Sequence, residues 1–244
     1  LAARGKKPES LDLDILSGKN IFKIDKSSDP RYDFTIEMDA EDPIDLWPHL
    51  KGRVQAKAHL GDLDTNPVAQ VEFTGRNLSY YGFTAGKAEG SLDYGPNGKG
   101  ESTVEITDFQ ISGDTPKDIT ADVSGDLQGH TVRFELSSPL VDSRIELTGR
   151  SEKGFWNGRV DAARFNLNED GPWHLTGPAH VMMRYGEIKP FTGCWQKAAE
   201  NACVTCSFSA SKGWTQAGDI DAPPYQYVSG LIKRIFETYS NPKQ

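Results

Sequence analysis

Residues 54–60 read Val54-Gln55-Ala56-Lys57-Ala58-His59-Leu60, in which apolar and polar side chains alternate at every position. Successive side chains of a β-strand point to opposite faces of its sheet, so this segment predicts a strand with one apolar and one polar face. The same alternation surrounds Phe73 and Phe134, and turn residues such as Gly61-Asp62 and Gln128-Gly129 separate the runs. We therefore predict an all-β chain in which strand follows strand with almost no helix between them.

The position of the apolar residues also shifts by one within some runs. Ile106 is at an even position but Phe109 is at an odd one, and a second shift separates residues 160–162 from residues 165–167. One extra residue that reverses the facing of a strand indicates a β-bulge, which bends the strand. We therefore predict a long, curled, groove-shaped sheet, like a taco shell, with an apolar interior. Regular strand spacing is equally typical of a sandwich or a closed barrel, and periodicity does not separate these architectures.

The composition argues against two classes of protein. The 244 residues include 27 Lys and Arg against 35 Asp and Glu, a net charge of −8 that opposes binding to nucleic-acid phosphates. No run approaches the roughly 18 consecutive apolar residues of a membrane-spanning helix, and residues 1–7 lack the apolar core of a signal peptide. Because the chain starts at Leu1 and not at Met, we expect it to be a piece of a longer protein, with any targeting or anchoring segment elsewhere.

Two segments have helical features. Residues 42–50 are bracketed by prolines and predict a single turn with Trp47 and Leu50 directed inward. From residue 227 to residue 239, apolar side chains recur at helical spacing and leave a charged side toward water. We therefore predict that residues 1–222 form the groove-shaped sheet and that residues 223–244 form an amphipathic helix and tail that dock on it.

No complete catalytic or metal-binding motif is present in the sequence. The stretch that begins at Asp62 imitates the start of a calcium loop, but Pro67 replaces the turn glycine and Phe73 replaces the bidentate glutamate. The nucleophile-elbow and phosphate-loop motifs are absent, and the five histidines are isolated along the chain. We therefore predict no catalytic residue, no cofactor and no metal site, and we expect that the chain is not an enzyme.

The three cysteines, Cys194, Cys203 and Cys206, lie within thirteen residues. Cys203 and Cys206 form a CxxC pair, a pattern that also occurs in zinc and redox sites. On an extended strand, however, Cys206 shares its side with the apolar Val204 while Cys203 points the other way, so the two sulfurs diverge. We favour a hairpin disulfide between Cys194 and Cys203, with Cys206 as a buried thiol, and keep a zinc site as the alternative. A disulfide indicates an oxidising compartment such as the periplasm.

Several short motifs follow one another in a defined order. They are a Trp-Pro-His-Leu stretch that opens residues 47–58, a turn over residues 61–67, Asn-Leu-Ser-Tyr at 77–80, a W-x-G-x-V strand at 156–160, a W-x-L-x-x-P-A strand at 173–179, and Cys194-Trp195 ahead of a strand with Cys203. In this order the motifs resemble the TamB family, which is related to the AsmA-like proteins, over about residues 40 to 215. Each motif is weak alone, and their order carries the resemblance.

The resemblance implies a tapered, groove-shaped sheet with a hydrophobic interior. Family membership would make the chain one segment of a very long periplasmic protein that is anchored in the inner membrane of a Gram-negative bacterium. It also implies roles in carrying phospholipid between the inner and outer membranes, and in assembling outer-membrane β-barrel proteins together with an outer-membrane partner. We expect the membrane anchor and the partner-binding domain of that family to lie outside this chain.

Our leading hypothesis is a lipid-binding segment of a bridge-like periplasmic conduit, because an apolar trough offers acyl chains about 25 cal/mol per Å² buried. The residues predicted to line the trough are apolar members of the alternating runs: Val54, Leu60, Val71, Phe73, Val104, Ile106, Val123, Phe134, Leu136, Ile145 and Leu147. The competing hypothesis is a chaperone-like module whose exposed sheet edges add a strand from an unfolded outer-membrane protein. Self-association through the same edges or the C-terminal helix is a further expectation, and a closed sandwich with a structural role is the third reading.

Overall fold

The computed structural model describes residues 12–62, 65–111, 113–167, 171–184, 187–209 and 213–218. Within these residues, sixteen strands and one short 3-10 helix follow one another along the chain. The first part contains β1 (Asp12–Ser17), β2 (Asn20–Lys26), β3 (Phe34–Ala40), the 3-10 helix η1 (Pro43–Asp45), β4 (Lys51–Gly61), β5 (Val68–Tyr80), β6 (Phe83–Tyr94), β7 (Gly100–Ile111) and β8 (Lys117–Gly125). The second part contains β9 (His130–Ser137), β10 (Val141–Glu152), β11 (Phe155–Leu167), β12 (Gly171–Leu175), β13 (Ala179–Arg184), β14 (Glu187–Lys197), β15 (Glu200–Ser209) and β16 (Gly213–Gly218).

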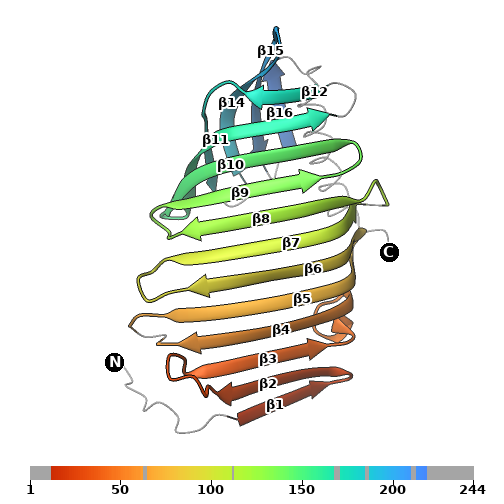
Figure 1. The fold of residues 1–244 in the computed structure, drawn as a ribbon, viewed down its shortest axis with the longest axis vertical. Helices are drawn as coiled ribbons and strands as arrows, with labels where there is room; N and C mark the ends of the chain where they lie inside the picture. Colours follow the sequence, from red (N-terminus) through yellow and green to blue (C-terminus); the bar gives the residue numbers. More distant parts are fainter. Residues whose placement is uncertain are drawn as a thin grey trace.

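All these strands belong to one antiparallel sheet (Figure 1). From β1 to β11 each strand pairs with the next strand in the sequence, so this part of the sheet is a continuous series of hairpins. β12 and β13 lie end to end between β11 and β14 and pair with both of them. The break between them falls at residues 176–178, where Pro178 has no N–H to donate to a neighbouring strand. The predicted all-β class is confirmed, and the sandwich and barrel alternatives are not what the described residues form.

The pairing register gives the sheet two chemically different faces. Met38 on β3 lies opposite Ala56 on β4, which in turn lies opposite Phe73 on β5. One position further along β4, Lys57 lies opposite Glu72 on β5. Directly opposed residues share a face of the sheet. We call the face with Met38, Ala56 and Phe73 the apolar face, and the face with Lys57 and Glu72 the charged face. The sheet is therefore one-sided, as the alternation in the sequence predicts.

Both predicted bulges are present. The pairing of β7 with β8 shifts between Ile106 and Phe109. In the pairing of β10 with β11, Val160 and Ala162 have successive partners in β10, so Asp161 between them is the extra residue. After the bulges, Phe109, Phe165 and Leu167 lie on the apolar face although their position in the sequence has shifted by one, whereas Ala162 lies opposite Glu146 on the charged face.

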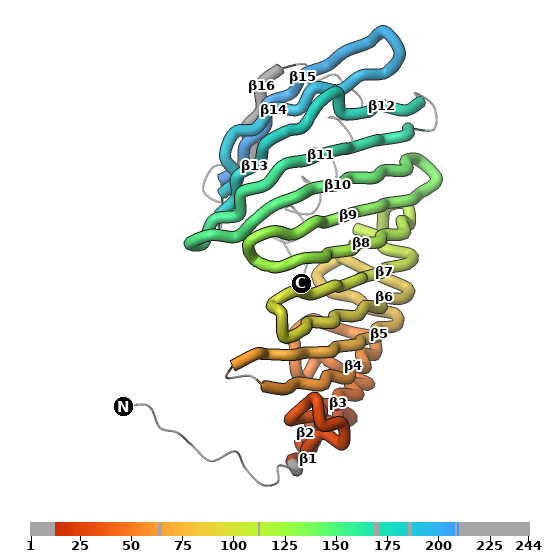
Figure 2. The backbone as a smooth tube through the Cα atoms, turned by 60° about the vertical axis from the view of Figure 1, so that its left-hand side comes forward, coloured from red at the N-terminus to blue at the C-terminus, as the bar shows by residue number. Residues whose placement is uncertain are grey.

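A line of unusual backbone positions crosses neighbouring strands near one end of β4 to β7. Asn77 and Asp108 have φ angles of 51° and 55°, and Gly52 has a φ of 111°. A Cβ at Gly52 would lie 2.6 Å from two carbonyl oxygens of β5, and a Cβ at Gly86 would lie 2.8 Å from a carboxylate oxygen of Asp108. We call these four residues the crease. Irregular positions of this kind bend strands, and Figure 2 shows the central strands curving at one end instead of running straight.

The segment between β3 and β4 differs from its prediction. Only Pro43–Asp45 form a helical turn, and the Trp47 side chain is 50% exposed, so the predicted inward direction of Trp47 is wrong. The buried Asn20 fixes this loop, because its Nδ2 donates to the Asp42 carbonyl oxygen (2.8 Å) and its Oδ1 accepts from the Asp42 N–H (3.1 Å). Beside the tied Asp42, Pro43 is the buried residue of this loop, and Trp47 lies exposed.

The predicted helix over residues 223–244 lies outside the described residues, and so does its docking on the sheet. A cluster of buried apolar residues lies on the apolar face around Leu136, Val141 and Phe165, all 4% exposed or less. Half-buried neighbours complete this cluster: Ile119, Phe134, Ile145, Leu167 and Trp195.

The apolar face as the candidate binding site

The register places every residue predicted to line a trough on the apolar face. Phe73 lies between Ala56 and Gly90, and Phe134 lies between Ala121 and Ile145. The others belong to the same rows of opposed residues on β4, β5 and β7 to β10: Val54, Leu60, Val71, Val104, Ile106, Val123, Leu136, Ile145 and Leu147. The structure thus brings the predicted set together on one continuous surface.

The apolar face is unevenly filled along the sheet. At β9 to β12 its side chains pack on one another, and the rings of Phe165 and Trp195 lie 5.1 Å apart between centroids. Toward the other end the same face is more open, with Leu13 43% exposed and Ile15 48% exposed on β1. The described strands form one sheet, so no second sheet among them covers this face. An uncovered apolar surface of this length is the candidate site for an apolar ligand.

Sequence reasoning missed how tightly one aromatic ring lies on the apolar face. In the W-x-G-x-V strand, Trp156, Gly158 and Val160 alternate onto this face, and Gly149 lies directly opposite Gly158. A Cβ at Gly149 or Gly158 would overlap the Trp156 ring. The indole therefore lies flat against backbone, and this spacing explains why glycine occupies the third position of the motif. His130, opposite Gly149, accepts a hydrogen bond from the Trp156 indole.

Two hollows among the described residues lie mainly on the charged face, and each is bordered by only one residue of the predicted site, Phe73 in the first and Leu136 in the second. One, of about 480 Å³, is bordered by Lys23, Glu37, Lys57 and Glu72 on β2 to β5. Lys57 and Glu37 form an ion pair there (2.9 Å), and Lys57 holds the pKa of Glu37 below its usual range through this contact. The other hollow, of about 490 Å³, lies over β8 to β11. Their mixed charges and exposed ion pairs are typical of a solvated sheet surface.

A disulfide joins Cys194 on β14 to Cys203 on β15. The two residues lie directly opposite each other in the register, and the adjacent Val204 is buried on the other face. Cys206 is a free thiol that lies on the same side of β15 as Val204, so Cys203 and Cys206 diverge as predicted and cannot share a metal ion. Cys206 is only half-buried, less than we expected for a buried thiol, because β15 is next to the last described strand. Burial raises the pKa of the Cys206 thiol.

The family model described as "TamB, N-terminal domain" matches residues 5–220 of the chain. The chain belongs to the TamB family. The "Translocation and assembly module subunit TamB" of Haemophilus influenzae (strain ATCC 51907 / DSM 11121 / KW20 / Rd) is 23% identical over 241 residues, which cover 94% of this chain and 18% of that relative. The chain thus spans less than a fifth of the length of the curated TamB relative that it matches. No solved structure matches the chain.

Two further observations describe this TamB-family segment. Among its described residues there is no helix that is both long and apolar enough to cross a bilayer. The same residues contain no group of three or more His, Cys, Asp or Glu side chains placed to hold a metal ion.

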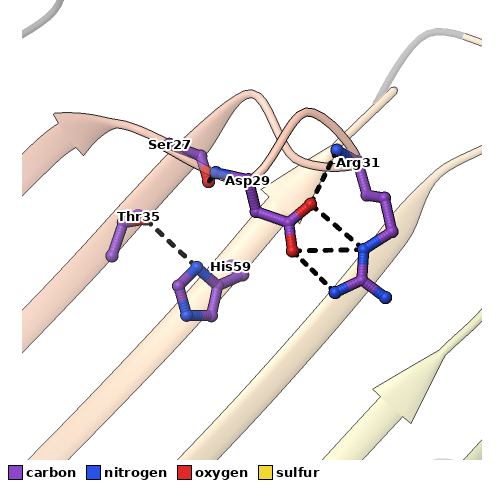
Figure 3. Close-up of polar contacts among 5 residues, drawn as sticks. All are labelled: Ser27, Asp29, Arg31, Thr35 and His59. Atoms are coloured by element: carbon purple, nitrogen blue, oxygen red, sulfur yellow. Dashed lines mark hydrogen bonds and ion pairs between the residues drawn. The ribbon is translucent and has the colours of Figure 1, made fainter.

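One rim of the sheet carries a charged turn between β2 and β3 (Figure 3). The Arg31 guanidinium donates to both carboxylate oxygens of Asp29, with Nη2 at 2.6 Å, and the Arg31 N–H donates to the same carboxylate at 3.0 Å. Behind the turn, Thr35 and His59 share a hydrogen bond of 3.1 Å between β3 and β4. The pKa of Asp29 is lowered to about 2, mainly by the side-chain hydrogen bonds from Arg31 and secondly by the hydrogen bond from the Arg31 N–H.

The Asp29 carboxyl is expected to titrate at about pH 2 in an NMR pH series of the carboxyl carbons. The pKa of Asp29 is lower in the folded chain than in the unfolded chain. The contact with Arg31 therefore stabilises the turn at pH values above the ordinary Asp pKa of about 3.9, and this stabilisation is lost as the pH falls from about 4 to about 2. The pair is exposed, so the effect on overall stability should be small. In Arg31→Ala the midpoint should return toward the ordinary value; an unchanged midpoint would show that Arg31 does not hold the carboxylate.

Proposed function

We propose that this chain is a periplasmic segment of a bridge-like conduit that binds the acyl chains of phospholipid on its apolar face. The supporting observation is an uncharged row of directly opposed residues that crosses eleven neighbouring strands. Its members, from β1 to β11, are Ile15, Phe22, Met38, Ala56, Phe73, Gly90, Val104, Ala121, Phe134, Ile145 and Ala163. A parallel row from Leu13 to Val160 has Ser102 as its single polar member.

The length of this row favours a conduit over a pocket. With strands about 4.8 Å apart, ten spacings between eleven strands cover about 48 Å. Half of a bilayer hydrocarbon core, which one acyl chain spans, is about 15 Å thick. The row is therefore about three times as long as one acyl chain needs, and it offers no charged group that would hold a lipid at one point. A surface of this kind suits a ligand that moves along the sheet.

Photo-crosslinking at matched neighbours tests the proposal. A photoreactive amino acid at Phe73 or Phe134, on the apolar face, should capture phospholipid, whereas the same amino acid at Glu72 or Arg133, on the charged face, should not. The experiment uses the purified chain after exposure to vesicles of phosphatidylethanolamine and phosphatidylglycerol, with captured lipid detected by mass spectrometry. Equal capture at Glu72 and Phe73 would contradict a lipid-binding apolar face.

A second candidate function is strand addition to an unfolded outer-membrane protein. The observation that favours it is β1, which ends the order of described strands and exposes Leu13, Ile15 and Leu16 without a proline to block pairing. A role in a translocation and assembly module, with an outer-membrane partner of the full-length protein, would use such an edge, and self-association would use it too. Replacing Leu16, which faces away from the apolar row, by Pro should then abolish capture of an unfolded β-barrel protein while leaving lipid capture at Phe134 unchanged.

A further inference from the structure

His130 and Trp156 form a hydrogen-bonded pair at one rim of the apolar face. Trp156 Nε1 lies 2.6 Å from His130 Nε2, and His130 Nδ1 lies 3.0 Å from the carbonyl oxygen of Asp126. Both nitrogens of the half-buried imidazole therefore have a partner. The ring joins the turn before β9 to the first residues of β11, which are separated from it by β10.

The chemistry of the two partners leaves one protonation state for the imidazole. An indole N–H only donates, so Nε2 must accept and carry no proton. A carbonyl oxygen only accepts, so Nδ1 must carry the proton. The contacts together require a neutral imidazole. A second proton, on Nε2, would place two N–H groups against each other at 2.6 Å and break the bond to Trp156.

No charged side chain on the apolar face takes part in this pair. The register neighbours of His130 are Gly125 on β8 and Gly149 on β10. Those of Trp156 are Ser151 on β10 and Met183 on β13. The Asp126 carboxylate is already occupied, because it accepts from the N–H groups of residues 128 and 129. The other nearby charged side chains occupy positions of the opposite face: Arg150, Glu152 and Arg184. Protonation of the imidazole is thus the charge change that acts directly on the bond.

We propose that His130 and Trp156 form an acid-released latch that holds the Trp156 ring down on the glycine floor of the apolar face. At neutral pH the indole is fixed over Gly149 and Gly158, where no side chain competes with it. When His130 is protonated, the ring loses its anchor and is free to rise from the floor into the trough. The inference rests on the proposed lipid-binding function, because it assigns to that face a response to pH. His is the side chain whose charge ordinarily changes between pH 5 and 8.

NMR of the indole N–H groups tests the latch without any lipid. The Trp156 resonance, identified by its absence in Trp156→Phe, should move upfield as the pH is lowered from 7.5 to 5.5. In His130→Gln the side-chain oxygen accepts the indole N–H at any pH, so the resonance should stay in place. The matched control is His59→Gln, which alters another half-buried histidine and should leave the titration of the Trp156 resonance unchanged. A Trp156 resonance that is constant between pH 7.5 and 5.5, or that titrates equally in His130→Gln, would overturn the latch.

Lipid retention separates this inference from the proposed function. Purified chain exposed to phosphatidylethanolamine and phosphatidylglycerol vesicles should retain less lipid at pH 5.5 than at pH 7.5, and His130→Gln should abolish that difference. Retention at both pH values with no difference between them would overturn the regulatory role. If no lipid were retained at pH 7.5 or at pH 5.5, the proposed function would be refuted, whatever the indole spectrum shows.

Discussion

Replacing Phe165 by alanine is expected to lower the free energy of unfolding by about 3–5 kcal/mol, the usual cost of removing a buried aromatic side chain. Phe165 is 4% exposed and packs with Leu136 and Val141 in the buried cluster of the apolar face. Its ring also contacts the Trp195 ring on β14, so one side chain connects β9, β10, β11 and β14. The cavity left by alanine would therefore disrupt packing between strands that are not neighbours in the sheet.

The matched control is Arg164→Ala, one position earlier on β11. Arg164 is exposed on the charged face, lies opposite Arg144, and forms no ion pair with any described residue, so its loss should change stability by less than about 0.5 kcal/mol. Urea unfolding followed by circular dichroism measures both variants. If Phe165→Ala lost no more stability than Arg164→Ala, this cluster would not be a packed core.

Much of the fold follows from local patterns, because facing in a strand depends only on the parity of positions. The alternation through residues 54–60 predicts which side chains of β4 share a face, and the structure agrees. The parity shifts between Ile106 and Phe109 and between residues 160–162 and residues 165–167 indicate the two bulges, although the second bulge lies at Asp161, before Ala162. A bulge leaves this signature in the sequence because apolar side chains must stay on the same face after the extra residue.

Features that depend on distant register could not be predicted from the sequence. Trp156 lies over Gly149, seven residues earlier, only because β10 and β11 pair in one particular register. The apolar character of Trp47 predicts an inward direction, but its loop is tied at Asp42 by Asn20 on a different strand, and Trp47 is exposed. The crease also combines positions such as Gly52 and Asp108, which are far apart in the sequence and fall into one line only once four strands have paired.

A charge at an open position of the apolar face is expected to impair lipid binding without unfolding the sheet. Val123 is 39% exposed and lies opposite Ser102 and Val132 in the second apolar row. Aspartate there remains partly hydrated in the free chain, so stability should change little. Against an acyl chain, however, the carboxylate would be desolvated without a partner, at a cost of at least about 1.4 kcal/mol, or tenfold in affinity. Val123→Asp should thus retain at least about tenfold less phospholipid than the unaltered chain.

Two controls separate charge from position and from shape. Thr131→Asp introduces the same carboxylate on the neighbouring strand, where Thr131 is exposed on the charged face opposite Ser124 and Thr148, and it should leave lipid retention unchanged. Val123→Thr keeps the shape of the side chain and adds only a hydroxyl, so its effect should fall between the two. Retention is measured by extracting phospholipid from purified, monodisperse protein whose unfolding midpoint has been checked. Equal losses in Val123→Asp and Thr131→Asp would indicate that net charge alone governs lipid association, and the apolar face would then not be the binding surface.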